Sequence, residues 1–153
     1  MIHCVKCSLW CCVCSLKGGP TAAYITWKPY YSVNDPSLDA EHKQIIECIN
    51  ELYAAMNGAD AAPATERVMD KLVRYTRTHF EHEERVLKEV ACPDFEAHKV
   101  LHDDMRRRTM GLRSHLDLVT ARDVLVLLKD WWLGHIQGED KKYAPYLQAV
   151  AAK

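Results

Sequence analysis

The sequence lacks long apolar runs, and no stretch reaches the roughly 18–20 residues that a membrane-spanning helix needs. Glycine and proline are scarce, at 6 residues each among 153, which excludes collagen-like and low-complexity proteins. Neither charge is in large excess: the formal net charge is −1, whereas a nucleic-acid-binding protein should carry a basic excess. These absences predict an ordinary globular protein without nucleic-acid partners and without a membrane span, and the length favours one domain.

Cysteine is the residue whose distribution is unusual. Two of the seven cysteines, Cys48 and Cys92, lie in the body of the chain, and the other five crowd into the N-terminus: Cys4, Cys7, Cys11, Cys12 and Cys14. A secreted fold held by disulfides spreads its cysteines along the chain. We therefore expect a reducing compartment, the cytoplasm.

Residues 1–22 form a cysteine-rich N-terminal extension that shows no helical periodicity. Its thiols suggest a zinc or redox site, but the spacing matches structural zinc modules poorly. The apolar stretch 9–16 after Lys6 suggests a signal peptide, but the positive segment is thin and no clear cleavage site follows. We favour a third interpretation, a disordered or wrongly assigned extension.

The rest of the chain, residues 25–150, reads as an all-α domain. An extended arm with turns precedes four amphipathic segments, at residues 38–56, 63–90, 94–116 and 120–143. Asn57-Gly58 ends the first segment, and Thr120 with Asp123 forms a capping pair for the fourth. No strand-like alternation appears. The pattern predicts an antiparallel up-down four-helix bundle with an extended N-terminal arm.

Polar residues interrupt the apolar stripe of every predicted helix. Burying an unpaired imidazole or carboxylate is costly, and all four helices incur that cost at a similar height of the bundle. A metal at the centre explains the shared height. The seven candidate ligands are His42, His79, Glu83, His98, His102, His135 and Asp140.

The spacing of these residues supports a metal site. His98 and His102 are four residues apart, as are His79 and Glu83, so each pair shares one helix face. His135 and Asp140 are five apart, which fits if Gly138 loosens the last turn. Each feature alone has a structural explanation, such as a hydrogen-bonded core histidine or a solvated acidic face, so the joint pattern carries the prediction.

The donors are sufficient for two ions. Five imidazoles, two bridging carboxylates and one shared solvent-derived oxygen fill all but about one of roughly twelve positions around two octahedral ions. Nitrogen and carboxylate donors without thiolate suit iron or manganese. The odd number of histidines makes the pair asymmetric, with three rings on one ion and two on the other. The open position, on the two-histidine ion, suits one small ligand.

These motifs resemble the hemerythrin family, specifically its single-domain bacterial members. The resemblance covers about Ile25 to Leu147 and rests on Trp27, Tyr31-Ser-Val33, Asp39-x-x-His42, His79-Phe80-x-x-Glu83-Glu84, His98-x-x-x-His102 and His135-Ile136-x-x-x-Asp140.

The resemblance implies two iron ions (Fe2+/Fe3+) with an oxo or hydroxo bridge and reversible binding of O2. It implies that His98, His102 and His135 hold one iron and that His42 and His79 hold the other. Glu83 and Asp140 would bridge the two ions. Asp39 is expected to cap the first helix or to support the ligands.

Apolar neighbours should keep water out of the ligand pocket, and we expect Ile45, Ile46, Leu101 and Trp131 in this role. Trp132 departs from the family, many members of which have leucine three residues before the fourth-helix histidine. We expect Trp132 either to narrow the pocket or hydrogen-bond near it, changing O2 release, or to turn outward and pack between helices.

The resemblance favours an oxygen carrier or storage protein rather than an enzyme, as a monomer whose recipient of O2 is unknown. A sensor of O2, NO or redox state is an alternative, as is a ferritin-like oxidase, a peroxide-reactive enzyme or an iron store. Ferritin-like sites use Glu-x-x-His. Here the residues three before the ligand histidines are Asp39, Thr76, Phe95, Lys99 and Trp132, which argues against an oxidase.

Overall fold

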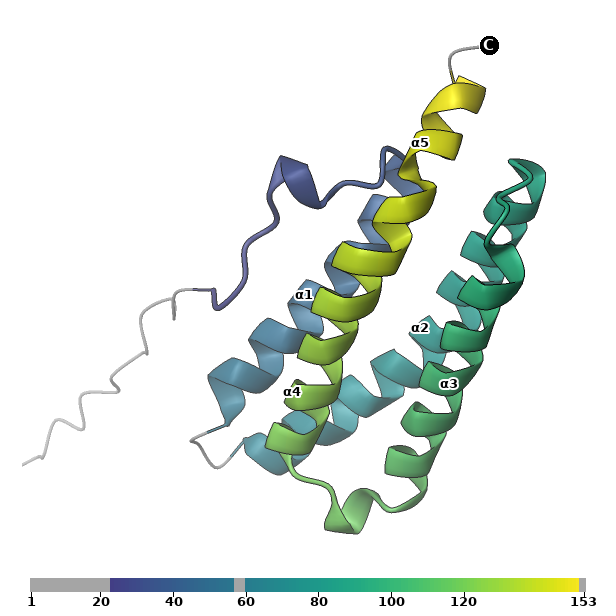
Figure 1. Ribbon diagram of the computed structural model, residues 1–153. Helices are drawn as coiled ribbons and strands as arrows, with labels where there is room; N and C mark the ends of the chain where they lie inside the picture. The colour runs from purple at the N-terminus through teal and green to yellow at the C-terminus, as the bar shows by residue number, and fades with distance from the viewer. Residues whose placement is uncertain (1–22, 57–59, 152–153) are drawn as a thin grey trace, which may run out of the picture.

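The computed structural model describes residues 23–56 and 60–151, and this part of the chain is helical, with no strand. Four long helical columns pack side by side as a bundle, with α4, η3 and α5 continuing into one another as the fourth column (Figure 1). The predicted four-helix bundle is confirmed. The elements in chain order are η1 (Pro29–Tyr31), α1 (Pro36–Ala55), α2 (Ala61–Glu89), α3 (Phe95–Ser114), η2 (Leu116–Leu118), α4 (Ala121–Asp130), η3 (Trp131–Glu139) and α5 (Asp140–Ala151).

The start of α1 is fixed by two aspartates. Asp35 is the N-cap, and its carboxylate accepts hydrogen bonds from the first turn, so the cap is Asp35 and not Asp39. Pro36 follows at the first helical position, where its missing N–H costs nothing. Asp39 instead accepts hydrogen bonds from the Ser32 hydroxyl and from the Val33 backbone N–H, at 2.9 Å for the latter. Asp39 therefore ties the arm to the helix.

The fourth column changes its winding halfway along. It begins with the predicted capping box between Thr120 and Asp123. After α4, the nine residues of η3 are π-helical, and α5 then resumes the ordinary α-helix. A π-helix holds more residues in each turn, so residues five apart return to the same face. The i,i+5 spacing of His135 and Asp140 is accommodated in this way.

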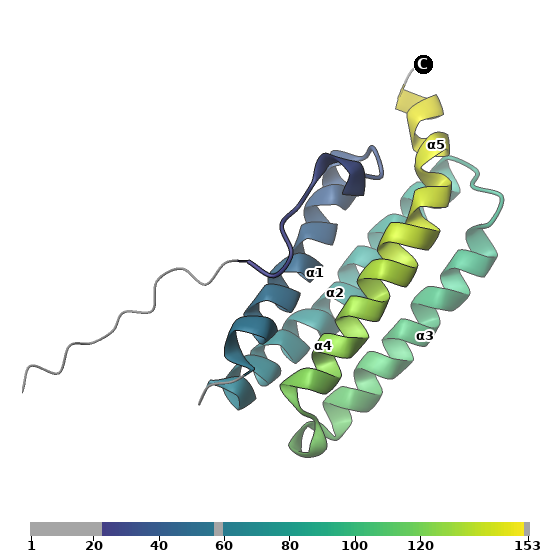
Figure 2. The same cartoon turned by 60° about the vertical axis from the view of Figure 1, so that its left-hand side comes forward.

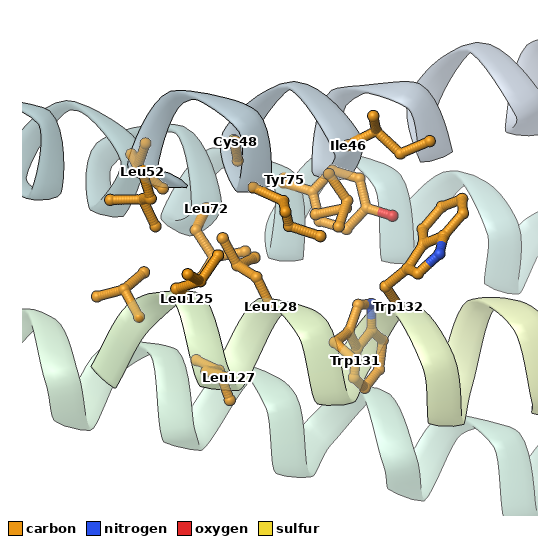
Figure 3. Close-up of a cluster of buried hydrophobic side chains, with 14 of the residues drawn as sticks. Ile46, Cys48, Leu52, Leu72, Tyr75, Leu125, Leu127, Leu128, Trp131 and Trp132 are labelled. Carbon is orange, nitrogen blue, oxygen red and sulfur yellow. The ribbon is translucent and has the colours of Figure 1, made fainter. Parts of the chain in front are cut away.

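Two groups of buried apolar side chains fill the bundle. The larger group occupies most of its length, and Figure 3 shows part of it between α1, α2 and α4. The smaller group lies toward the other end and consists of Val33, Leu38, Leu87, Tyr143, Ala144 and Leu147. On α1, His42 falls between Leu38 of the smaller group and Ile45 of the larger. The polar layer therefore lies between two apolar regions.

The N-terminal arm lies along the outside of the bundle beside α1 (Figure 2). The backbone of Ile25 exchanges two hydrogen bonds with the Asn50 side chain, at 2.9 and 2.8 Å. Further along the arm, the Trp27 ring packs edge-on against Trp132, with centroids 6.3 Å apart. Within residues 23–56 and 60–151, no helix combines the length and apolar character needed to cross a membrane. The predicted extension at residues 1–22 lies outside the described residues.

Candidate metal centre

All seven predicted ligands lie in the interior of the bundle at one height. Each helical column contributes at least one of them. Their exposed fractions run from 0% to 7%, and the residues are His42, His79, Glu83, His98, His102, His135 and Asp140. Polar groups buried this deeply require partners that replace water.

The donor atoms fall into two groups that share Glu83. One group combines Glu83 with His98, His102 and His135, and its donor atoms all lie within 4.8 Å of one another. The other combines Glu83 with His42 and His79 under the same limit. The structure thus places three imidazoles on one side and two on the other.

The two carboxylates reach both groups. Glu83 places Oε2 at 3.0 Å from His79 Nε2 and Oε1 at 3.1 Å from His98 Nε2. Asp140 places Oδ2 at 3.2 Å from His42 Nε2 and Oδ1 at 3.0 Å from His135 Nε2. Each carboxylate therefore has one oxygen toward each histidine group, as a bridging ligand requires.

Two further glutamates orient the histidines: Glu84, which belongs to a motif noted in the sequence but had no predicted role, and Glu41, which was not predicted. Glu41 accepts from Nδ1 of His79 at 2.6 Å, and Glu84 accepts from Nδ1 of His102 at 3.1 Å. A carboxylate on one ring nitrogen fixes the tautomer and leaves the other nitrogen free to bind a metal. Glu41 also contacts Nδ1 of His82, at 2.9 Å, so His82 and His79 share the same carboxylate.

Charge in the site favours a cation. Burial raises the pKa of Glu83, but hydrogen bonds from His102, His79 and His98 hold it well below its usual range. Burial also lowers the pKa of His79, yet Glu41 and Glu83 raise it to about 9. The metal-free site thus combines an ionised carboxylate with a protonated imidazole. A metal ion binding there would displace the proton.

Unpaired polar atoms test whether these residues fit metal ions. Both ring nitrogens of His42 and both carboxylate oxygens of Asp140 have no hydrogen-bond partner among the described residues. His42 Nε2 lies 3.2 Å from Asp140 Oδ2, and His135 Nε2 lies 3.0 Å from Asp140 Oδ1, so Nε2 of His42 and the two Asp140 oxygens face the same region of the interior. Buried groups without partners are rare unless an ion or ligand satisfies them. The residues present therefore fit a centre of two metal ions with nitrogen and oxygen ligands.

Comparison with known proteins identifies the family. The family model of the hemerythrin HHE cation binding domain matches residues 35–147, which is most of the chain. The chain belongs to the hemerythrin family. The site geometry and the family model agree on a hemerythrin centre built from histidine and carboxylate ligands.

Named relatives within the hemerythrin family cover most of the chain. A bacteriohemerythrin of Stenotrophomonas maltophilia (strain R551-3) is 30% identical over 129 residues, which span 83% of this chain and 84% of the relative. A myohemerythrin of Theromyzon tessulatum is 28% identical over 117 residues, or 76% of this chain and 88% of the relative. A crystal structure of a hemerythrin point mutant matches with a TM-score of 0.71 and 27% identity, covering 82% of this chain and 98% of that one.

The predicted pocket residues take different positions around this hemerythrin centre. Ile45 and Ile46 are 1% and 5% exposed in the larger apolar group. Trp131 is 7% exposed and stacks on His135, with ring centroids 3.7 Å apart. Leu101 is 37% exposed and lines a surface hollow rather than the interior. The buried lining therefore comes from α1 and η3.

Trp132 turns toward the N-terminal arm. Its ring packs edge-on against Tyr31, with centroids 5.1 Å apart, and against Trp27. Figure 3 shows the two neighbouring indoles pointing in different directions. Trp132 is only 2% exposed, so the arm covers it. This placement favours the packing role that the sequence left open.

Replacing Trp132 with leucine should loosen the arm. We expect Trp132→Leu to lower the free energy of unfolding by about 2 kcal/mol, because the smaller side chain loses the two edge-on aromatic contacts. Chemical denaturation measures the change. The control is Leu133→Ala, since Leu133 is 64% exposed. Unchanged stability with altered O2 release would instead assign Trp132 to the ligand pocket.

Proposed function

We propose that this hemerythrin-family protein binds O2 reversibly at a diiron centre and serves as an oxygen carrier or store. The observation that carries the proposal is the set of seven buried donors, three histidines on one side, two on the other, with two carboxylates reaching both. Five imidazoles and only two carboxylates make a site that resembles carriers more than the carboxylate-rich sites of ferritin-like proteins.

The proposed assignment gives His98, His102 and His135 to one iron, and His42 and His79 to the other. Glu83 and Asp140 would hold both ions. When bound, the two irons supply the electrons that O2 takes up and returns. The ion held by His42 and His79 would have one protein ligand fewer, which would leave a position for O2.

The remaining residues hold this arrangement and protect it. Glu41 and Glu84 keep the rings of His79 and His102 in the tautomer that offers Nε2 to a metal. Buried apolar side chains such as Ile45 exclude water. A site without bulk water limits protonation and loss of the bound ligand.

Optical spectroscopy tests the proposal. Iron-loaded, reduced protein should be nearly colourless, and air should produce a visible absorption band that disappears under vacuum over repeated cycles. Iron-free protein serves as the control and should show no band. Irreversible bleaching with release of peroxide, or with oxidation of an added substrate, would favour the oxidase alternative.

A further inference from the structure

Tyr75 lies directly beside the centre without belonging to the ligand set. It is on α2, four residues before His79, so both residues share one face of the helix. The two rings stack, with centroids 4.5 Å apart and an interplanar angle of 27°. The side chain is fully enclosed, with the residue 4% exposed. Any ligand on the His79 side of the centre is therefore close to this ring.

The Tyr75 hydroxyl has no hydrogen-bond partner among the described residues. Burying a hydroxyl without a partner costs free energy, and phenylalanine would fill the same space without that cost. Buried polar groups of this kind require an explanation, such as a ligand. Because a phenol is protonated at neutral pH, the unpaired group is available as a hydrogen-bond donor.

The direction of the hydroxyl supports a role at the centre. In Figure 3 the oxygen of Tyr75 points toward the end of the apolar cluster where Trp131 and Trp132 lie. His135 follows Trp131 by one turn, so this is the end that borders the ligand layer. Burial raises the pKa of Tyr75, and the charges of Glu83 and Asp140 raise it further, which is consistent with a hydroxyl near both carboxylates.

Two other buried donors nearby lie on the other side of the centre. Nε1 of Trp131 and the hydroxyl of Tyr143 also have no partner within the described residues. The Trp131 ring stacks on His135, however, and the Tyr143 ring packs edge-on against His98, and both histidines belong to the three-histidine group. Tyr75 stacks on His79, which belongs to the two-histidine group with the proposed open position. Of these three donors, Tyr75 is therefore the one on the side of the proposed open position.

We propose that the Tyr75 hydroxyl donates a hydrogen bond to the small ligand bound on the His42 and His79 side, and so sets how tightly that ligand is held. This inference rests on the proposed diiron function. The ligand class is a small molecule or anion that accepts a hydrogen bond at its bound atom, for which azide is a stable probe. Tyr75 acts here as a binding residue and adds no bond to the metal.

The test compares Tyr75→Phe with wild type and with Tyr53→Phe. Tyr53 is 47% exposed on α1, so the same loss of a hydroxyl occurs away from the centre. All three proteins are loaded with iron, analysed for metal, oxidised and titrated with azide. We expect equal iron contents in all three proteins and equal azide affinities for wild type and Tyr53→Phe. Tyr75→Phe should bind azide at least roughly tenfold more weakly than wild type.

Infrared spectroscopy of the bound azide gives a second readout. The azide stretch should shift between H2O and D2O in wild type, and Tyr75→Phe should reduce this shift. Full iron loading with unchanged affinity and unchanged isotope shift in Tyr75→Phe would overturn the Tyr75 inference alone. A wild-type chain that binds no iron would overturn the proposed function as well.

A structure of the wild-type azide complex keeps the test independent of the variant. It should place the Tyr75 oxygen within hydrogen-bond distance of azide. An azide bound on the other side of the centre, or a hydroxyl turned away from it, would refute the inference even if Tyr75→Phe failed to fold.

Discussion

Replacing Glu83 with glutamine should reduce iron binding to about half of the wild-type content or less and abolish the oxygen-dependent colour. The substitution keeps the volume but removes the negative charge at the point where the two histidine groups meet. Glu83 is the residue common to both groups, and its oxygens lie 3.0 Å from His79 Nε2 and 3.1 Å from His98 Nε2. Without it, Asp140 is the sole carboxylate left to neutralise two cations.

Metal analysis after reconstitution measures the effect of Glu83→Gln. Glu81→Gln provides the matched control, because Glu81 lies on the same helix but faces solvent, and it should bind as much iron as wild type. Circular dichroism checks that both variants remain helical. A Glu83→Gln protein that retains its full iron content would exclude Glu83 as a bridging ligand.

Removing the iron should lower the free energy of unfolding by about 4 kcal/mol, the value expected when free metal exceeds its dissociation constant roughly a thousandfold. The metal-free bundle contains the unpaired Nε2 of His42 and the unpaired oxygens of Asp140. Metal binding would satisfy these atoms, and in the folded state only. Unfolded chains lack the assembled site, so the binding energy adds to the stability of the fold.

Chemical denaturation of iron-loaded and chelator-treated protein measures this difference. The Glu83→Gln variant serves as the control, since it should show a much smaller gap between the two conditions. Identical denaturation curves for loaded and chelated wild type would show that the seven donors do not hold a metal in the folded protein.

The helices were predictable from sequence because the apolar stripe has a constant period. The predicted segments 38–56 and 94–116 correspond to α1 and α3 within about two residues at each end. The capping pair of Thr120 and Asp123 was equally visible, because it depends on residues three apart in the chain. Features of this kind are set by residues close together in the sequence, so they can be predicted without knowing the tertiary packing.

The orienting glutamates were not predictable in the same way. Glu41 lies beside His42 and off the apolar stripe, so its position alone suggests a solvated residue. Its partner His79 is 38 residues away in sequence and reaches it only after α1 and α2 pack together. In the sequence, Glu41 is recognisable only as a glutamate next to a candidate ligand. Acidic residues beside buried ones are common, so this position alone does not indicate an orienting role.

The direction of single side chains around the centre also required the structure. Leu101 precedes His102 by one residue, which turns it roughly 100° from the ligand face of α3. From sequence, Trp132 could face the pocket or pack between helices, and the structure places it against Tyr31 of the arm. The π-helical winding was foreseen only as a loosened turn at Gly138, whereas it extends over all of η3.

The π-helical winding of η3 also affects how the smaller apolar group packs. If the whole fourth column were α-helical, the buried face of α4 would continue through positions about one residue away from those that face inward in α5. The wider winding corrects this phase, so the same rotation that aims Asp140 at the histidines also brings Tyr143 and Leu147 against Leu38 and Leu87. The packing of the smaller apolar group and the direction of Asp140, the second proposed bridging carboxylate, thus both depend on the π-helical winding of η3.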